Sequence, residues 1–194
     1  MVRASTSKGI SFIALMAALG NVLSFISIQL SPIIPQIPLG PINFSLALDF
    51  SHLATFIAAL IGGPVVGGLV GLVGGFVAAF QFGFSQGNIL SGICLPIGKA
   101  MTGIAAGFLF KQIKSRGLMM MVVTVLSYLP EAVFTALIFI YLYPAFYGFP
   151  QALAIMVSIQ ILVKAFVEML IMGALLSFIA GSRGFKTFTS SFWT

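Results

Sequence analysis

Residues 43–82 read NFSLALDFSHLATFIAALIGGPVVGGLVGLVGGFVAAFQF, and this stretch decides the fold class. Two apolar segments meet at the corner Gly62-Gly63-Pro64, and no charged residue follows Asp49 within them. The second segment carries glycines at positions 67, 68, 71, 74 and 75. Glycines three and four residues apart remove side chains from one face of a helix, so that another helix can approach closely. The stretch therefore predicts a closely packed hairpin of two membrane helices.

The composition of the whole chain leads to the same class. Of its 194 residues, 60% are hydrophobic and 6% are charged, whereas soluble domains carry about a quarter charged residues. The net charge of +6 does not indicate nucleic-acid binding, because the basic residues flank apolar segments. The single cysteine, Cys94, leaves no internal disulfide and no cysteine-rich zinc site. We predict an all-α integral membrane protein.

Six apolar segments reach or approach the length of about 20 residues that a spanning helix needs. Together they make residues 1–194 a single membrane domain, with helices at about 10–30, 46–61, 64–82, 89–110, 118–142 and 151–180. Prolines at positions 32, 35, 38 and 41 interrupt the first connection. We expect 31–41 to be extended, either at the membrane interface or as a lid over a cavity.

Successive connections between spanning helices lie on alternate sides of the membrane, and the basic residues outside these helices all fall on one side. They are Arg3, Lys8, Lys111, Lys114, Arg116, Arg183 and Lys186. The opposing connections contain no lysine or arginine. Because positive charges mark the cytoplasmic side of a membrane protein, we expect both termini in the cytoplasm. The basic start of the chain is then the cytosolic lead-in to a retained first helix.

Four charged residues lie inside predicted helices, namely Lys99, Glu131, Lys164 and Glu168. A charge at membrane depth costs several kcal/mol and usually faces a partner or a cavity. The four charges sum to zero, which suggests that they pair with one another. Lys164 and Glu168 are four residues apart and share a helix face. The group is either a structural ion-pair cluster or part of a ligand site.

Asp49 and His52 stand at the start of the second helix, three residues apart on one face. Asp49 either stabilises the positive end of the helix dipole or faces the ligand. His52 has no second histidine or cysteine cluster beside it, so we predict no metal site. No cofactor motif is present. The chain also has no Walker A sequence, so any ATP hydrolysis that it needs must come from another subunit.

Three motifs in sequence order resemble a known family. The first helix carries Ala14 and Ala18 in an Ala-x-x-x-Ala pattern, ahead of the proline-rich connection. The block from Leu48-Asp49-Phe50-Ser51 to the glycine-proline corner follows, and the last helix carries Gln160-Ile161-Leu162-Val163-Lys164. This set resembles the substrate-binding S component of energy-coupling factor (ECF) vitamin transporters. Gln160 stands where relatives often have asparagine, and His52 stands where an acidic residue is expected.

The resemblance implies a six-helix bundle in the plasma membrane of a prokaryote. Such a subunit captures a vitamin or related micronutrient at its outward face. It delivers the solute inward together with a scaffold, the T component, and two ATPase subunits. Ala14 and Ala18 would contact the scaffold. The Leu-Asp-Phe-Ser block looks most like riboflavin-type members, but the pantothenate and folate branches share similar blocks.

We expect the substrate-binding residues to be the polar ones on the helices near the outward side. They are Lys164, Gln160, Glu168, Glu131, Tyr128, Lys99, Asn43 and Asp49, with Phe146 and Tyr147 as aromatic residues that could stack on a ring. Two other classes of function stay open. One is a small intramembrane enzyme that uses Glu131, Glu168 or Asp49 as acid or base, and the other is a structural membrane subunit.

Overall fold

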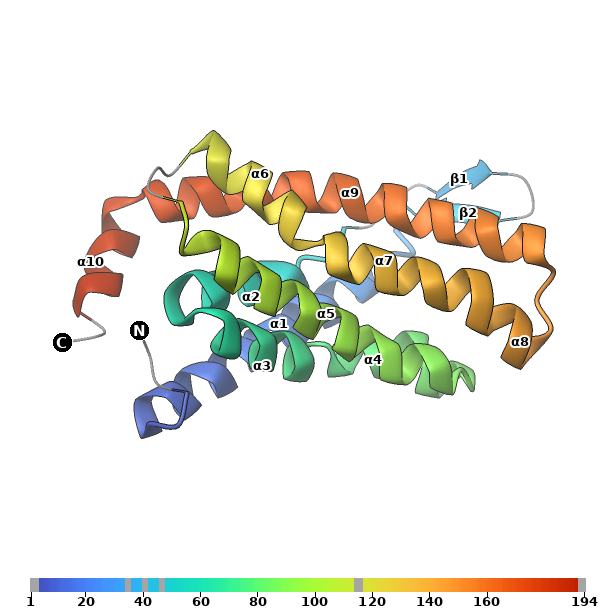
Figure 1. Cartoon of the computed structure of the whole chain (residues 1–194), viewed down its shortest axis with the longest axis horizontal. Helices are drawn as coiled ribbons and strands as arrows, with labels where there is room; N and C mark the ends of the chain where they lie inside the picture. The colour runs from blue at the N-terminus through green and yellow to red at the C-terminus, as the bar shows by residue number, and fades with distance from the viewer. Residues whose placement is uncertain (1–3, 34–35, 40–41, 46–47, 114–116, 192–194) are drawn as a thin grey trace.

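The computed structural model describes residues 4–33, 36–39, 42–45, 48–113 and 117–191. These residues form a bundle of helices along one long axis, with a small hairpin at one end (Figure 1). The elements of the first half are α1 (Ser7–Leu30), β1 (Gln36–Leu39), β2 (Ile42–Ser45), α2 (Ser51–Gly62), α3 (Pro64–Gly74), α4 (Phe76–Phe82) and η1 (Phe84–Gln86). Those of the second half are α5 (Ile89–Phe110), α6 (Leu118–Ser127), α7 (Leu129–Leu137), η2 (Ile138–Leu142), α8 (Tyr143–Tyr147), α9 (Gln151–Gly181) and α10 (Arg183–Ser191).

Five helical stretches of the described chain are long and apolar enough to cross a membrane. They are Ser7–Leu30, Pro64–Gln86, Ile89–Phe110, Leu118–Tyr147 and Gln151–Gly181. The sixth apolar helix, Ser51–Gly62, is shorter than these. The predicted fold class, an all-helical membrane bundle, is confirmed. The small exception is the proline-rich connection, where β1 and β2 pair antiparallel.

The helices differ in four details from the sequence prediction. The third predicted helix, 64–82, divides into α3 and α4. The second helix begins at Ser51 and not at residue 46, and the Asp49 side chain accepts a hydrogen bond from the Ser51 amide just before it. The fifth predicted helix extends to Tyr147, but it divides into α6, α7, the π-helical turn η2 and α8. A further helix, α10, follows the last spanning helix.

The glycines of α3 allow this helix to pack directly on the backbone of α5. A Cβ atom on Gly67 would lie 2.5 Å from the Gly103 carbonyl oxygen, and one on Gly71 would collide with the Lys99 carbonyl oxygen. The predicted close approach at these glycines is confirmed, and its partner is α5. Because Lys99 lies on the contacted stretch of α5, this packing also fixes the position of a buried charge.

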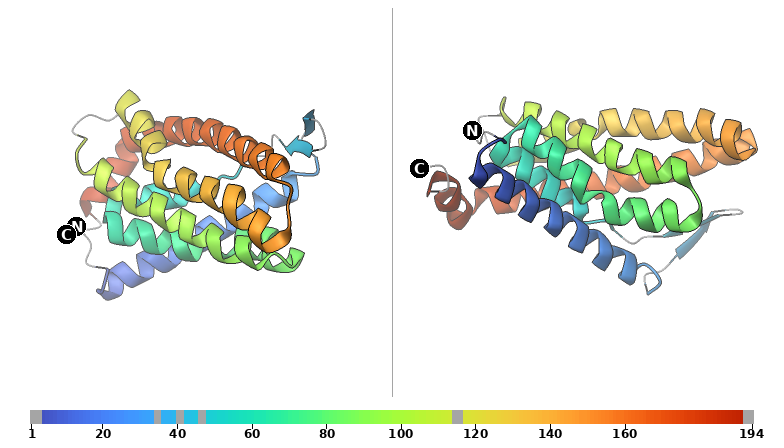
Figure 2. Two further views of the ribbon diagram at one scale, coloured as in Figure 1. Left: turned by 45° about the vertical axis from the view of Figure 1, so that its right-hand side comes forward. Right: turned by 90° about the horizontal axis from the view of Figure 1, so that it is seen from below.

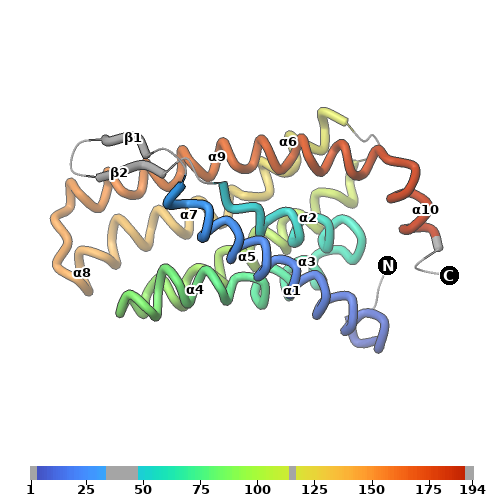
Figure 3. Tube along the Cα trace, turned by 180° about the vertical axis from the view of Figure 1, so that it is seen from behind, coloured from blue at the N-terminus to red at the C-terminus, as the bar shows by residue number. Residues whose placement is uncertain are grey.

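The elements at the two ends of the bundle differ. The start of α1, the end of α5, the start of α6 and α10 lie at one end (Figure 2). The hairpin lies at the opposite end (Figure 1), together with the connection between α4 and α5 and with α8 (Figure 3). Lys8, Lys111, Arg183 and Lys186 belong to the elements of the first end, which we call the basic end.

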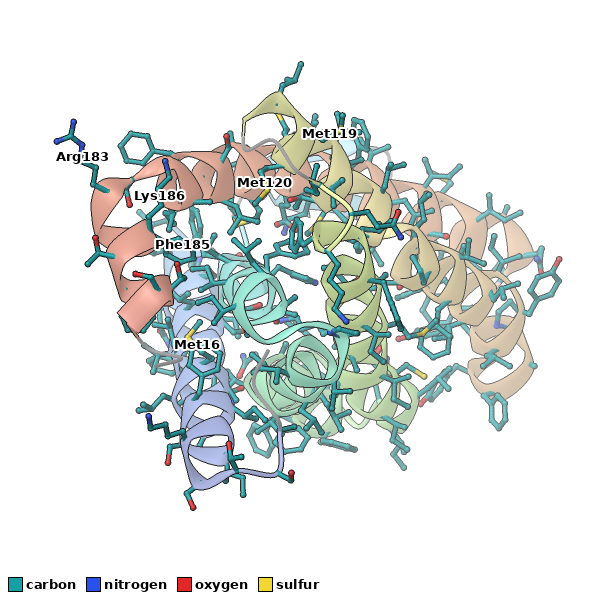
Figure 4. The ribbon with its side chains drawn as sticks, turned by 60° about the vertical axis from the view of Figure 1, so that its left-hand side comes forward. Met16, Met119, Met120, Arg183, Phe185 and Lys186 are labelled. Carbon is teal, nitrogen blue, oxygen red and sulfur yellow. The ribbon has the colours of Figure 1, made fainter. Side chains whose placement is uncertain are left out.

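The hydrophobic core occupies the half of the bundle that includes the basic end. One cluster includes Phe56, Phe110 and Met172, and a second includes Phe12 and Val70. Helix α10 crosses this end, and Phe185 packs against both clusters while Arg183 points away from the bundle (Figure 4). The half of the bundle that includes the basic end is therefore filled with side chains, and the cavity described below lies in the other half.

Candidate functional site

A cavity of about 430 Å³ lies in the half of the bundle away from α10. Its walls come from the second half of α1, the start of α2, α4, the first half of α5, the helical stretch 128–143 and α9. Its polar lining residues are Ser24, Ser27, Ser31, Asp49, His52, Ser91, Lys99, Tyr128, Glu131, Thr135, Tyr143, Lys164 and Glu168. The rest of the lining is apolar, as in most cavities that bind small molecules.

The first polar group in this cavity joins α5 to the start of α2. Lys99, only 3% exposed, places its Nζ atom 3.3 Å from Asp49 Oδ2 and donates a hydrogen bond to the Ser51 hydroxyl. Burial alone would raise the pKa of Asp49, but Lys99 and, to a smaller extent, His52 and the Ser51 hydrogen bonds hold that pKa well below its usual value of 3.8. Asp49 is therefore an ionised carboxylate beside a buried ammonium group.

The second polar group is centred on the buried carboxylate of Glu131. Thr102 donates a hydrogen bond of 2.5 Å to Glu131 Oε2, and His52 Nε2 lies 3.3 Å from the same oxygen. The His52 ring packs edge-on against Tyr128, with ring centroids 6.4 Å apart. Its other nitrogen, Nδ1, is buried and has no hydrogen-bond partner among the described residues.

The third polar group lies on α9. Lys164 Nζ is 3.8 Å from Glu168 Oε1, and that oxygen accepts a hydrogen bond of 2.9 Å from the Asp49 amide. Glu168 therefore fixes the start of α2 against α9. About a third of the Lys164 side chain is exposed, and Lys164 lines the cavity. Lys164 is therefore the more accessible of the two lysines that line the cavity.

Aromatic residues form the end of the cavity nearest α8. Phe139 in η2 and Tyr143 at the start of α8 stack with ring centroids 4.4 Å apart. The Tyr143 hydroxyl also bonds to the Ser91 hydroxyl on α5. π-Helical turns are rare and often occur at functional sites. The turn here presents this aromatic pair to the cavity.

Six of the eight predicted site residues line this one cavity. They are Lys164, Glu168, Glu131, Tyr128, Lys99 and Asp49. Gln160 is half-buried on α9 but is not among the lining residues. Asn43 belongs to β2, and its side chain lies outside the part of the structure that is described. Neither Phe146 nor Tyr147 lines the cavity, and Phe146 is 73% exposed.

The predicted pairing of the buried charges is partly confirmed. Lys164 contacts Glu168, four residues away on the same helix, as expected. Lys99 and Glu131 do not pair with each other, and they contact Asp49 and His52 instead. The predicted pairing considered only the four charges inside the helices. The partners come from the connection before α2 and from its first turn, which pack between α5, α7 and α9.

Seven polar residues of the cavity lining are not among the predicted site residues, and Ser24 and His52 are two of them. Ser24, Ser27 and Ser31 are spaced three and four residues apart along an otherwise apolar helix, which places them on one face. That spacing was the available signal. For His52, nothing in the sequence identifies Glu131 as its partner, because the two residues are 79 positions apart.

In the part of the chain that the structure describes, groups that could support catalysis do not form a recognisable site. Among the described residues, no group of three or more histidine, cysteine, aspartate or glutamate side chains could hold a metal ion. Residues 83–87 read GFSQG, which matches the spacing of a G-x-S-x-G nucleophile elbow. However, Ser85 lies in the short turn η1, and its hydroxyl donates to the Gln81 carbonyl. A helix, α5, follows this turn, but helix α4 precedes it where a nucleophile elbow has a strand.

The fold and the cavity define a class, a multi-pass helical membrane protein with a small-molecule-sized cavity in one half of the bundle. Residues 8–180 match the family model described as the ECF transporter, substrate-specific component. The chain belongs to this family and is thus a substrate-binding subunit of a transporter. A search of curated proteins finds no match.

Proposed function

We propose that this chain captures a vitamin or related small micronutrient at the outward face of a prokaryotic plasma membrane. It delivers the solute inward as part of an ATP-driven ECF-type importer. The observation that carries the proposal is the cavity of about 430 Å³, which brings three carboxylates and two lysines together within the membrane-spanning bundle. Charged groups at membrane depth commonly mark a substrate pathway.

The distribution of charge supports an outward-facing cavity. The cavity lies in the half of the bundle opposite the basic end. Positively charged segments are typical of the cytoplasmic side of membrane proteins. With the basic end in the cytoplasm, both termini are cytoplasmic, and the hairpin β1–β2 lies on the outer side, at the end of the bundle opposite α10 (Figure 1). The hairpin is then a candidate lid.

The partners that we propose are a scaffold T component and two ATPase subunits. The chain has no Walker A sequence of its own. Ala14 and Ala18 are both exposed on α1, whereas Ala17 between them is buried. A second membrane helix can approach closely over such small side chains. We therefore assign the scaffold contact to the face of α1 that carries Ala14 and Ala18.

Within the cavity, Lys164 is the proposed donor to a carbonyl group of the solute. Lys99, Asp49, Glu131 and Glu168 hold one another and the cavity wall in position through the contacts described above, and Tyr128 packs beside His52. Gln160 and Asn43 stay predicted contacts, to be tested after Lys164. Riboflavin is one candidate solute, alongside other vitamins of similar size.

Mass spectrometry of the small molecules released from gently purified protein tests the proposal. We expect one vitamin-sized molecule in stoichiometric amount, unchanged in mass after prolonged incubation with the protein. Lys164→Ala should weaken its rebinding, whereas Lys111→Ala, at the basic end, should not. If no molecule is released and no vitamin raises the melting temperature, the proposal is wrong. Conversion of the released molecule to a product would favour the enzyme alternative.

A further inference from the structure

The charges around the cavity leave no positive charge in excess. Its lining contains three carboxylates, two ammonium groups and one imidazole, so its net charge is −1 with a neutral imidazole and zero with an imidazolium. Both lysines already contact carboxylates, at 3.3 Å for Lys99 and 3.8 Å for Lys164. An anionic solute would have to enter beside three carboxylates, and its desolvation would not be offset by an unpaired cation.

Each of the three carboxylates, like each of the two lysines, already has a partner. Asp49 contacts Lys99 and accepts from the Ser51 amide. Glu131 accepts from Thr102 and lies beside His52, and the third carboxylate, Glu168, accepts from the Asp49 amide and contacts Lys164. A cationic solute would therefore meet no carboxylate without a partner. Burying a charge in a largely apolar cavity is unfavourable unless a free counter-charge is available.

Two neutral polar atoms of the cavity wall do lack partners. Ser24 is 1% exposed and His52 is 6% exposed. Neither Ser24 Oγ nor His52 Nδ1 has a hydrogen-bond partner in the described part of the chain, and both residues line the cavity from adjacent helices. Buried polar atoms are nearly always hydrogen-bonded in folded proteins, because an unsatisfied one costs free energy. A polar solute that reaches these two atoms from the cavity would satisfy both.

The chemistry of the missing partner follows from the histidine. When the Nε2 hydrogen of His52 is directed at the Glu131 carboxylate, Nδ1 of the neutral ring carries a lone pair and can only accept. The partner must then supply an N–H or O–H group. We infer that the cavity selects an uncharged solute that donates a hydrogen bond to His52 Nδ1 and forms a second one with the Ser24 hydroxyl. This inference rests on the proposed function.

Binding of related solutes, one uncharged and one anionic in each pair, tests the first half of the inference. Suitable pairs are riboflavin and its 5′-phosphate, pantothenol and pantothenate, and nicotinamide and nicotinate, with thiamine as a permanent cation. We expect the uncharged member of any pair that binds to raise the melting temperature more and to bind at least about tenfold more tightly. Tighter binding of an anionic member, or of thiamine, would overturn the inference and leave the transport function standing.

A solute outside this panel is judged from the molecule that co-purifies with the protein. Its charge near neutral pH follows from its mass and electrophoretic mobility, and a charged molecule overturns the inference as surely as a charged member of a pair. If nothing binds and nothing co-purifies, the proposed function itself fails, and the inference fails with it.

A pair of serine variants tests the second half. Ser24→Ala should weaken binding of the solute about three- to tenfold, the loss of one hydrogen bond. It should leave the melting temperature of the empty protein unchanged or slightly higher, because the hydroxyl has no partner there. Ser158 on α9 is the matched control, since its hydroxyl is also buried and without a described partner but does not line the cavity. Equal affinities of the two variants would show that Ser24 does not contact the solute.

Discussion

The two ring nitrogens of His52 have different surroundings, and substitution can separate them. Nε2 faces Glu131, and Nδ1 has no partner among the described residues. A glutamine amide reaches roughly the position of Nε2, whereas an asparagine amide reaches that of Nδ1. We therefore expect His52→Gln to keep the stability of the empty protein but to lose most of its ligand-induced rise in melting temperature.

His52→Asn should behave in the opposite way. It removes one of the partners of Glu131, so the empty protein should melt at a lower temperature. It keeps a hydrogen-bond acceptor toward the cavity, so ligand should still raise the melting temperature by nearly the wild-type amount. Melting curves in detergent with and without the co-purified solute measure both quantities. Wild-type binding by His52→Gln would contradict a contact between the solute and Nδ1.

The ion pair of Lys99 and Asp49 is expected to contribute to stability as a pair. Lys99→Met leaves the Asp49 carboxylate without its counter-charge, a change that costs about 3–5 kcal/mol for a fully buried pair. The cost here should lie at the lower end, because 28% of the Asp49 side chain is exposed. The double variant with Asp49→Asn should recover most of the loss in melting temperature. Recovery of stability without recovery of binding would assign the pair to the substrate site.

The stability that the ion pair of Lys99 and Asp49 contributes should change with pH in one direction. The pKa of Asp49 is lower in the folded protein than its ordinary value of 3.8, because Lys99 stabilises the carboxylate against the effect of burial. The contribution is therefore fully present above about pH 4 and is lost as the pH falls further. The melting temperature of wild type, taken relative to that of the double variant, should be constant from about pH 5 to 8 and should fall below about pH 4.

At the scale of elements, the contact between α3 and α5 connects a glycine to the site. Gly71 lies against the backbone of α5 at Lys99, so Gly71→Ala must push α5 away. We expect a loss of about 1–3 kcal/mol, typical of overpacking, together with weaker ligand binding because Lys99 moves. Gly181→Ala is the control, because a Cβ atom there meets nothing within 4 Å. If the Gly71→Ala variant binds the ligand as tightly as wild type does, the contact between α3 and α5 does not influence ligand binding.

The sequence predicts elements well where the signal is local. Runs of apolar residues located the helices, and glycine spacing located the face of α3 that packs closely. The late start of α2, the π-helical turn η2 and the hairpin β1–β2 were not predicted. The start of α2 is fixed by contacts of Asp49 with α5 and α9. Such contacts depend on packing between segments far apart in the chain.

In the cavity, too, contacts within one helix were predictable and contacts between distant segments were not. The pair of Lys164 and Glu168 follows from the pitch of one helix and was predictable. The contacts of Lys99 with Asp49 and of His52 with Glu131 join residues 50 and 79 positions apart. They depend on the rotation of each helix about its axis within the bundle. The sequence therefore identified all five aspartate, glutamate and lysine residues of the cavity, but only one of their ion pairs.

The whole molecule combines a filled half at the basic end with a hollow half beyond it. The filled half contains Phe56, Phe110 and Met172 and is covered by α10. Dense cores deform little, so the subunit should move in the membrane as one body during transport. Such movement requires a partner that binds the outer surface of the bundle. The exposed Ala14 and Ala18 on α1 are the proposed contact with that partner.

Enlarging this face should prevent assembly while leaving substrate capture intact. Ala14→Trp projects a large ring from α1 where a scaffold helix must approach closely, and neither Ala14 nor Ala18 lines the cavity. We expect the variant to bind the solute as wild type does but to lose most of the scaffold and ATPase subunits during affinity purification. Phe178→Trp is the control, since Phe178 on α9 is 81% exposed and already large. If Ala14→Trp still retains the scaffold, or if Phe178→Trp loses it equally, the scaffold must contact another face of the bundle, and the face opposite α1 becomes the next to test.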